Sequence, residues 1–184
     1  MLVVYRLFDR ERLEKLLTHT FLSCAFLFYI ADSNQALSDN NHLCKEAIGV
    51  DGAMEMIQRA NNIDPKGEYV FSDLMEWKPK VPVDIVHSME VVYYFRDPKK
   101  LILHMKDEWL KPGGSIIMGL DFYKENFACH TWPKDLNTEM TLLSIKEWLD
   151  LLKNCHFCDV KSYQTNSTDT FAGTLVLYAK KLKK

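Results

Sequence analysis

From residue 46 onward, short apolar runs alternate with amphipathic segments, and this alternation is the strongest constraint on the fold. Each short run is strand-like and bounded by polar or glycine-containing turns, whereas the segments between them carry apolar residues at helical spacing. Strand and helix alternating at this spacing predict an α/β fold, a mostly parallel sheet with helices on both faces. The expected strands are residues 46–50, 68–71, 83–87, 115–120, 157–164 and 174–179.

The expected helices cover residues 53–60, 97–110 and 144–154. The second has Asp97 as its N-cap and Pro98 at its first position. The third opens with a capping box. The last two strands are joined by residues 165–173 alone, with no helix between them, and are therefore expected to be antiparallel neighbours at one edge.

The first 45 residues form an atypical N-terminal part. Residues 9–18 predict an amphipathic helix, and residues 31–41 are polar and turn-like. Between them, residues 21–30 (FLSCAFLFYI) are the most apolar stretch, but a membrane span needs about 20 apolar residues. They are read as a buried central strand, with a membrane anchor as the weaker alternative. No repeat or domain boundary is visible, so residues 1–184 are expected to form a single domain.

Composition excludes several classes of protein. The chain has 184 residues, with 23 basic and 25 acidic side chains and a formal charge of −2, so a nucleic-acid partner is not expected. Five scattered cysteines indicate reduced thiols and a cytoplasmic location. The CxxC at residues 155–158 has no second pair, which favours two half-buried thiols over a zinc site, and no metal is expected.

The residues that follow the strands are the candidate site, because ligands of open parallel sheets bind at the carboxyl ends of strands. Asp51 is placed to accept hydrogen bonds from ribose hydroxyls, and Gly52 would let the backbone turn closely around a ligand. The carboxylate of Asp73 could accept from an adenine amino group. Taken singly, an acid after a strand is more often a helix cap or a solvated charge.

Taken in order, with the LKPGG turn before the fifth strand, these segments resemble the class I S-adenosylmethionine-dependent methyltransferases. The matching segments are AIGVDGAMEMIQRA, YVFSDLMEW, VDIVHSMEVVYYFRDPKKLILHM and WLKPGGSIIMG, within residues 46–180. The resemblance implies a Rossmann-like seven-stranded sheet in the order 3-2-1-4-5-7-6 with the last strand antiparallel. It also implies S-adenosylmethionine as cosubstrate.

The resemblance assigns roles to matching positions. Asp51 would hold the ribose hydroxyls, with Gly52 and Ala53 beside the adenine. The adenine ring would be framed by Ser72, Asp73 and Leu74. The face toward the methionine part and the methyl group would be lined by His87, Ser88, Met89 and Glu90.

The chain departs from this family at the first strand. The family's strand ends in a glycine-rich loop against the methionine part, since a Cβ there would collide with the ligand. Here every glycine lies at or after position 49, and residues 28–37 contain none. Asp32 is the acid that would take the place of the motif's acid. The loop is either remodelled around the cofactor or no longer binds it.

Residues 121–140 are the expected substrate-loop insertion. Aromatic and polar side chains are concentrated in them, and Tyr123, Glu125 and His130 are the candidate catalytic residues, of which Glu125 or His130 could take a proton from the acceptor. The alternative is an ordered surface excursion whose aromatic rings pack on the sheet edge. For Tyr93 and Tyr94, core packing is favoured over catalysis.

Two hypotheses follow from the sequence. The first is a methyltransferase acting on a small molecule; the second is a catalytically impaired member of the fold that serves as a binding or regulatory partner. A nicotinamide oxidoreductase would need a GxGxxG that the first 48 residues cannot contain, and a nucleic-acid methyltransferase would carry an Asn-Pro-Pro-Tyr-like motif after the fourth strand. The methyl acceptor, the atom methylated and the oligomeric state stay open.

Overall fold

The computed structural model describes residues 2–7 and 44–183, which build one seven-stranded sheet in the order β3-β2-β1-β4-β5-β7-β6. The α/β class expected from the alternation is therefore present. The strands are β1 (Leu2–Leu7), β2 (Cys44–Asp51), β3 (Glu68–Phe71), β4 (Val83–Met89), β5 (Leu110–Leu120), β6 (Phe157–Thr165) and β7 (Thr174–Lys181).

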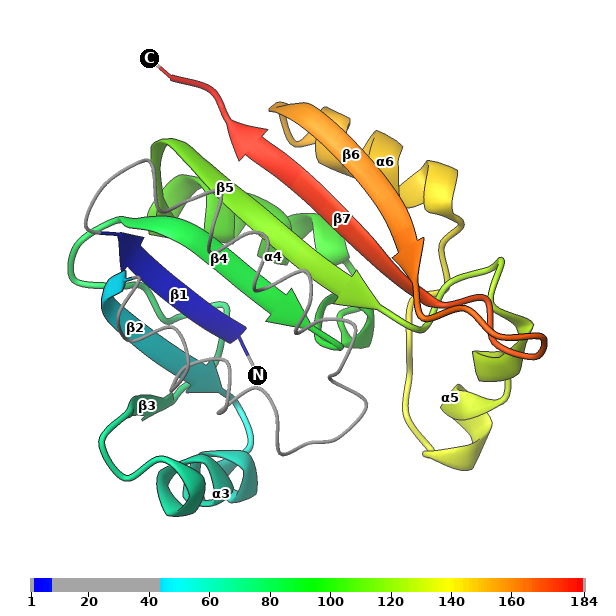
Figure 1. Ribbon diagram of the computed structural model, residues 1–184, viewed down its shortest axis with the longest axis horizontal. Coiled ribbons are helices and arrows are strands. Elements are labelled where there is room, and N and C mark those ends of the chain that lie inside the picture. Colours follow the sequence, from blue (N-terminus) through cyan, green and yellow to red (C-terminus); the bar gives the residue numbers. More distant parts are fainter. Residues whose placement is uncertain (1, 8–43, 184) are drawn as a thin grey trace.

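The central position between β2 and β4 is filled by β1, which runs antiparallel to both neighbours. This corrects the expectation that only the last strand is reversed. Figure 1 shows the arrow of β1 pointing against those of β2 and β4. Leu2 pairs with Val50 and with Ser88, whereas Leu7 pairs with Cys44. The carboxyl end of β1 therefore lies at the edge of the sheet opposite Asp51.

Two apolar runs in the N-terminal part could each have supplied a central strand, and periodicity alone does not separate them. Residues 2–7 (LVVYRL) are rich in β-branched and aromatic side chains, which suit a strand. The expected strand 21–30, the expected helix 9–18, the polar stretch 31–41 and Asp32 all lie outside the described residues.

The remaining strands β2 to β6 share one direction, because β2 pairs parallel with β3, β4 pairs parallel with β5, and β7 is antiparallel to both β5 and β6. The antiparallel edge pair expected from the short connection between the last two strands is confirmed. As a result, the carboxyl ends of β2, β4 and β5 point to one edge, at the lower right of Figure 1.

The helical elements follow the expected positions with local differences. They are α3 (Met54–Ile63), η1 (Val92–Tyr94), α4 (Pro98–His104), η2 (Met105–Trp109), η3 (Phe127–Cys129), α5 (Trp132–Asp135) and α6 (Ile145–Asn154). Figure 1 shows α4 and α6 behind the sheet. No helix in the described part of the chain is long and apolar enough to cross a bilayer.

The predicted N-terminal cap of α6 is confirmed, and that of α4 is only partly correct. Ser144 and Glu147 form the expected capping box: the Glu147 N–H donates to the Ser144 hydroxyl at 3.2 Å, and the Ser144 N–H donates to the Glu147 carboxylate at 2.7 Å. Asp97 does precede α4, but its side chain makes no capping hydrogen bond. The expected LKPGG turn is the first part of β5.

The main hydrophobic cluster lies between the sheet and the helices that follow β4 and β5. Val86, Ile116 and Leu177 from three adjacent strands are fully buried in it, as are Leu101 of α4 and Trp148 of α6. Burial of such side chains contributes about 1.5–3 kcal/mol each relative to exposure. This packing fixes the strand ends that form the candidate site.

Candidate functional site

The loops after β2 and β3 are joined by a backbone hydrogen bond. The N–H of Ser72 donates to the carbonyl oxygen of Asp51 at 3.0 Å. The Asp51 carboxylate in turn accepts from the N–H of Ala53 at 2.8 Å, and the side chain is half-buried. Asp51 is thus held at the carboxyl edge, where its carboxylate is oriented by its own loop.

Gly52 could carry a Cβ without a clash against the described residues. Among these, the Cβ would meet the carbonyl oxygen of Ser72 at 3.7 Å, which is ordinary contact. Its φ angle is outside the left-handed region, so the turn itself does not require glycine. The expectation that Gly52 lets the backbone pass close to a ligand stays a prediction.

Asp73 and Leu74 occupy different environments. The carboxylate of Asp73 is exposed and accepts from the N–H of Met75 at 2.8 Å, which closes a turn of its own loop. Leu74 is buried in the main hydrophobic cluster. Of the three residues expected to frame an adenine ring, Ser72 and Asp73 are the ones whose side chains reach the surface region.

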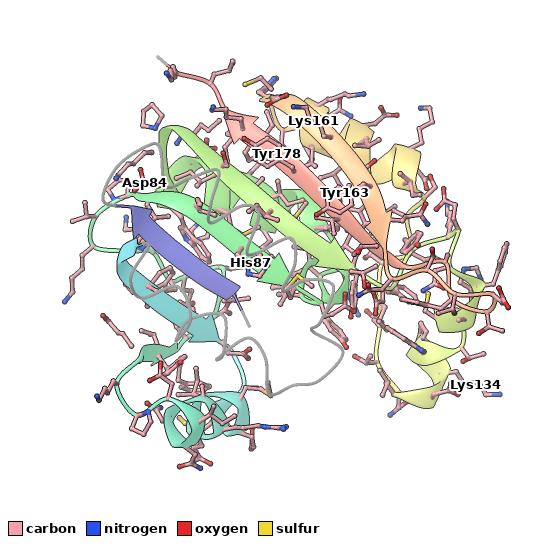
Figure 2. All side chains as sticks on the ribbon, in the orientation of Figure 1. Asp84, His87, Lys134, Lys161, Tyr163 and Tyr178 are labelled. Carbon is pink, nitrogen blue, oxygen red and sulfur yellow. The ribbon has the colours of Figure 1, made fainter. Side chains whose placement is uncertain are left out.

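His87, Ser88 and Met89 end β4 in the centre of the sheet, where Figure 2 labels His87. His87 is 3% exposed, and burial lowers its pKa to about 4, so its imidazole is neutral at pH 7. The Ser88 hydroxyl is fully buried and has no hydrogen-bond partner among the residues that the structure describes. Met89 lies against Gly119, where a Cβ would be 2.3 Å from its sulfur.

The half-buried Glu90 and the buried Asp121 form an acidic pair that spans the ends of β4 and β5. Glu90 Oε1 accepts from the backbone N–H of Asp121 at 2.8 Å, and Oε2 accepts from the Tyr93 hydroxyl at 2.6 Å. Burial and the neighbouring Asp121 raise the pKa of Glu90 to about 8. Burial also raises the pKa of Asp121. Glu90 is therefore mostly protonated at neutral pH.

The sequence placed Glu90 and Asp121 after separate strands but did not show their pairing. The expected core packing is confirmed for Tyr93, which is buried, and wrong for Tyr94, which is 45% exposed. The pairing depends on the register of β4 and β5, in which Met89 lies opposite Gly119. The signal that could have pointed to it is an acid directly after each of two adjacent parallel strands.

A family model for a methyltransferase domain matches residues 35–161, more than half of the chain. The chain belongs to the methyltransferase domain family. Its resemblance to the class I S-adenosylmethionine-dependent enzymes is thereby confirmed. The glycine-free segment that departs from the family lies outside the described residues.

Two curated relatives are trans-aconitate 2-methyltransferases. The one from Azoarcus sp. (strain BH72) is 33% identical over 71 residues, covering 39% of this chain and 28% of the relative. The one from Klebsiella pneumoniae (strain 342) is 23% identical over 125 residues, covering 64% of this chain and 48% of the relative. The chain thus spans less than half the length of the curated relatives it matches.

Solved structures share the fold of this methyltransferase domain. A putative methyltransferase in complex with the Trm112 methyltransferase activator of Haloferax volcanii has a TM-score of 0.69, 23% identity, and coverage of 82% of this chain and 79% of that chain. The N-methyltransferase NodS from Bradyrhizobium japonicum WM9, with S-adenosyl-L-homocysteine, has a TM-score of 0.64, 16% identity, and coverage of 82% and 74%.

The described residues fit the adenosine half of S-adenosylmethionine. Asp51 would offer its carboxylate to the ribose hydroxyls, Gly52 has no side chain to keep a ligand from the backbone, and Asp73 is exposed on the neighbouring loop. The methionine half would lie toward β1 and β4. At that edge lies Leu2, the amino end of β1, whereas Leu7 lies at the other edge of the sheet.

The three candidate catalytic residues of this domain each have a structural contact. The Tyr123 hydroxyl is buried, donates to the Gly173 carbonyl at 2.7 Å and accepts from Gln164 at 2.8 Å. Glu125 accepts from the N–H of Ile145 at 3.0 Å and thereby caps α6. Their catalytic role stays a prediction.

His130 is exposed on the same segment. Its Nε2 lies 3.0 Å from the carbonyl oxygen of Lys124, and its ring meets Phe127 edge-on with centroids 5.3 Å apart. Nearby, a surface hollow of about 430 Å³ lies beside the α5–α6 connection and is lined by Arg96, Pro133, Thr138, Glu139, Met140 and Thr141. Within residues 2–7 and 44–183, no three His, Cys, Asp or Glu side chains group as metal ligands.

Proposed function

We propose that this domain binds S-adenosylmethionine at the carboxyl edge of the sheet and transfers its methyl group to a small-molecule acceptor. The observation that carries the proposal is the hydrogen bond between Ser72 and Asp51, because it holds a carboxylate beside the backbone of Gly52, where a Cβ would meet no close contact from the described residues. The family membership supports the same cosubstrate.

When bound, S-adenosylmethionine supplies an electrophilic methyl group on a sulfonium centre. The chain's own contribution would be mainly positioning, since methyl transfer depends chiefly on alignment of the nucleophile. Asp51 and the backbone at Gly52 and Ala53 would anchor the adenosine end. The neutral His87 and the Glu90–Asp121 pair would surround the acceptor side at the ends of β4 and β5.

A small-molecule acceptor is supported by the curated relatives, which are named for trans-aconitate. Trans-aconitate is therefore the first acceptor to assay. The five cysteines and their expected reduced state support a cytoplasmic location, which fluorescence microscopy of the tagged protein would test.

A second candidate function is favoured by the direction of β1. Leu7, the last residue of β1, pairs with Cys44, so β1 presents its amino end, and not its carboxyl end, at the edge where Asp51 lies. This supports a catalytically impaired domain that acts as a binding or regulatory partner. The solved neighbour in complex with Trm112 supports including a protein partner in the test.

Calorimetry separates the two functions. Purified, folded protein is titrated with S-adenosylmethionine and with S-adenosylhomocysteine, alongside Asp51→Ala and the control Asp135→Ala, whose side chain is exposed on α5. Binding at about 1 μM, or about −8 kcal/mol, that is lost in Asp51→Ala and kept in Asp135→Ala supports the enzyme.

No heat from folded wild type, with or without an added Trm112 protein, would exclude the enzyme. It would leave the partner function, and the search would turn to proteins that co-purify with the domain. If Asp51→Ala and Asp135→Ala bind S-adenosylmethionine equally well, Asp51 does not contact the cosubstrate and the proposed binding site is wrong.

A further inference from the structure

Asp121 is a buried carboxylate with an unsatisfied oxygen. Its residue is 6% exposed, and Oδ1 accepts no hydrogen bond from any residue that the structure describes. The carboxyl group does receive a hydrogen bond from the side chain of Thr174 on β7. Buried polar atoms are normally paired, and an unpaired carboxylate oxygen is among the least favourable exceptions. The oxygen therefore lacks a donor that a ligand could provide.

Glu90 holds the backbone of Asp121 in place and donates no hydrogen bond to its Oδ1. Both of its oxygens are already engaged, one by the Asp121 N–H and the other by the Tyr93 hydroxyl. Glu90 also adopts a left-handed backbone conformation, with φ of 54°, and its N–H donates to the Gly119 carbonyl at 3.0 Å. Strained non-glycine residues of this kind are concentrated at functional sites.

Aromatic rings lie beside the Glu90–Asp121 pair. The ring of Tyr93 is 5.5 Å from that of Phe122, and Phe122 stacks with Trp132 at 6.3 Å between centroids. Acidic oxygens beside aromatic faces attract cations, by direct charge and through the ring quadrupole. An anionic ligand at the same place would be repelled by Asp121.

We propose that Asp121, positioned by Glu90, binds the ammonium group of an amine methyl acceptor. The proposal rests on the proposed function and names its substrate class. An ammonium group has three N–H donors and a positive charge, which satisfy Oδ1 of Asp121. The position agrees with an acceptor: β2 and β5 are three strand spacings apart, so Asp121 lies about 14 Å along the edge from Asp51.

A second source of an ammonium group is the amino-acid end of S-adenosylmethionine itself. The test therefore includes 5′-methylthioadenosine, which keeps the adenosine and thioether but lacks the amino acid. The acceptor probes are phenethylamine and 3-phenylpropionate, which match in ring and length but differ in charge.

The variants are Asp121→Asn, which keeps the shape and removes the charge, and the control Asp135→Asn on the surface of α5. Calorimetry is done on protein saturated with S-adenosylhomocysteine, and folding is checked by circular dichroism. We expect wild type to bind phenethylamine at least about tenfold tighter than 3-phenylpropionate, and Asp121→Asn to lose about tenfold or more in amine affinity. Asp135→Asn should match wild type.

Equal amine affinity in Asp121→Asn and wild type overturns the proposal, as does tighter binding of 3-phenylpropionate or of trans-aconitate. Loss of S-adenosylhomocysteine affinity in Asp121→Asn, with 5′-methylthioadenosine and phenethylamine unaffected, assigns the ammonium group to the cosubstrate and also overturns it. If Asp121→Asn does not fold, the charge preference of the wild type still decides.

If the proposed function itself is wrong, the calorimetry gives a different result: wild type gives no heat with S-adenosylmethionine or S-adenosylhomocysteine. The amine and acid probes are then titrated against the free protein, and a preference for the amine that depends on Asp121 still supports the ammonium site. Absence of any such preference overturns it independently of the cosubstrate.

Discussion

The backbone N–H of Ser72 donates to the carbonyl oxygen of Asp51 at 3.0 Å and so joins the loops after β2 and β3. Asp51 and Gly52 are on one of these loops, and Asp73 is on the other. Because β2 and β3 are parallel in register, with Asp51 opposite Phe71, the hydrogen bond continues the sheet into the site.

Replacement of Gly52 separates folding from ligand binding. In Gly52→Ala the new Cβ meets Ser72 O at 3.7 Å and no other described atom within 4 Å, so we expect the free energy of unfolding to change by less than about 0.5 kcal/mol. If the cosubstrate lies against this backbone, calorimetry should show at least about a tenfold loss of S-adenosylmethionine affinity. Full affinity in this variant would show that the ligand does not approach Gly52.

Gly173→Ala is the matched contrast. Gly173 has φ of +94°, and its Cβ would lie 2.6 Å from the Thr165 carbonyl oxygen. We expect this variant to lose about 1–3 kcal/mol of unfolding free energy in urea titrations, because both backbone strain and a clash with fixed backbone are introduced. A change below about 0.5 kcal/mol would contradict the role of this glycine.

The raised pKa of Glu90 leads us to expect that the free energy of unfolding falls as the pH rises. Its pKa is raised by burial from 4.5 to about 8, so between these values the native state keeps a proton that the unfolded state has lost. The free energy of unfolding therefore falls as pH rises through this window. The contribution of Glu90 is fully present below about pH 4.5 and is gone above about pH 8.

The buried imidazole of His87 acts in the opposite direction. Its pKa is lowered from 6.5 to about 4, so its contribution rises with pH and is complete by pH 6.5. Between pH 6.5 and 8 we expect Glu90 to reduce stability by up to about 2 kcal/mol, and Glu90→Gln to remove that slope. Urea titrations at several pH values test this, with the exposed Glu76→Gln as control. Identical slopes in wild type and Glu90→Gln would refute it.

Asp121→Asn should stabilise the free protein. The substitution removes a buried negative charge whose Oδ1 lacks a donor within the described structure, and it keeps an oxygen for the Thr174 hydrogen bond. We expect the free energy of unfolding at pH 7.5 to rise by about 1 kcal/mol. Thermal melts monitored by circular dichroism measure the change. A loss of stability of similar size would indicate that Asp121 serves the fold.

Glu125 should behave as a helix cap. Its carboxylate accepts from the Ile145 N–H at 3.0 Å, next to the capping box of Ser144 and Glu147. We expect Glu125→Ala and Ser144→Ala each to lose about 1 kcal/mol of unfolding free energy. Ser167→Ala, in an exposed loop, is the control and should change little. If Glu125→Ala keeps its stability but loses methyl transfer, Glu125 is a catalytic residue and not a helix cap.

Local signals in the sequence determined much of this fold. The Ser144–Glu147 capping box was predicted because both partners lie within one helical turn, and the antiparallel pair of β6 and β7 was predicted because nine residues are too few for a crossover helix. Asp51 and Asp73 were also predicted at the carboxyl edge, because each lies at or just after the end of a predicted strand.

Only the tertiary structure decided which segment became the central strand and in which direction. Residues 2–7 and 21–30 are both apolar runs, and the choice of residues 2–7 depends on pairing with β2 and β4 at long range. The Glu90–Asp121 pair likewise depends on strand register, which joins residues 31 positions apart. The local sequence determines whether a segment prefers helix or strand. The pairing of strands distant in the sequence determines which side chains come into contact.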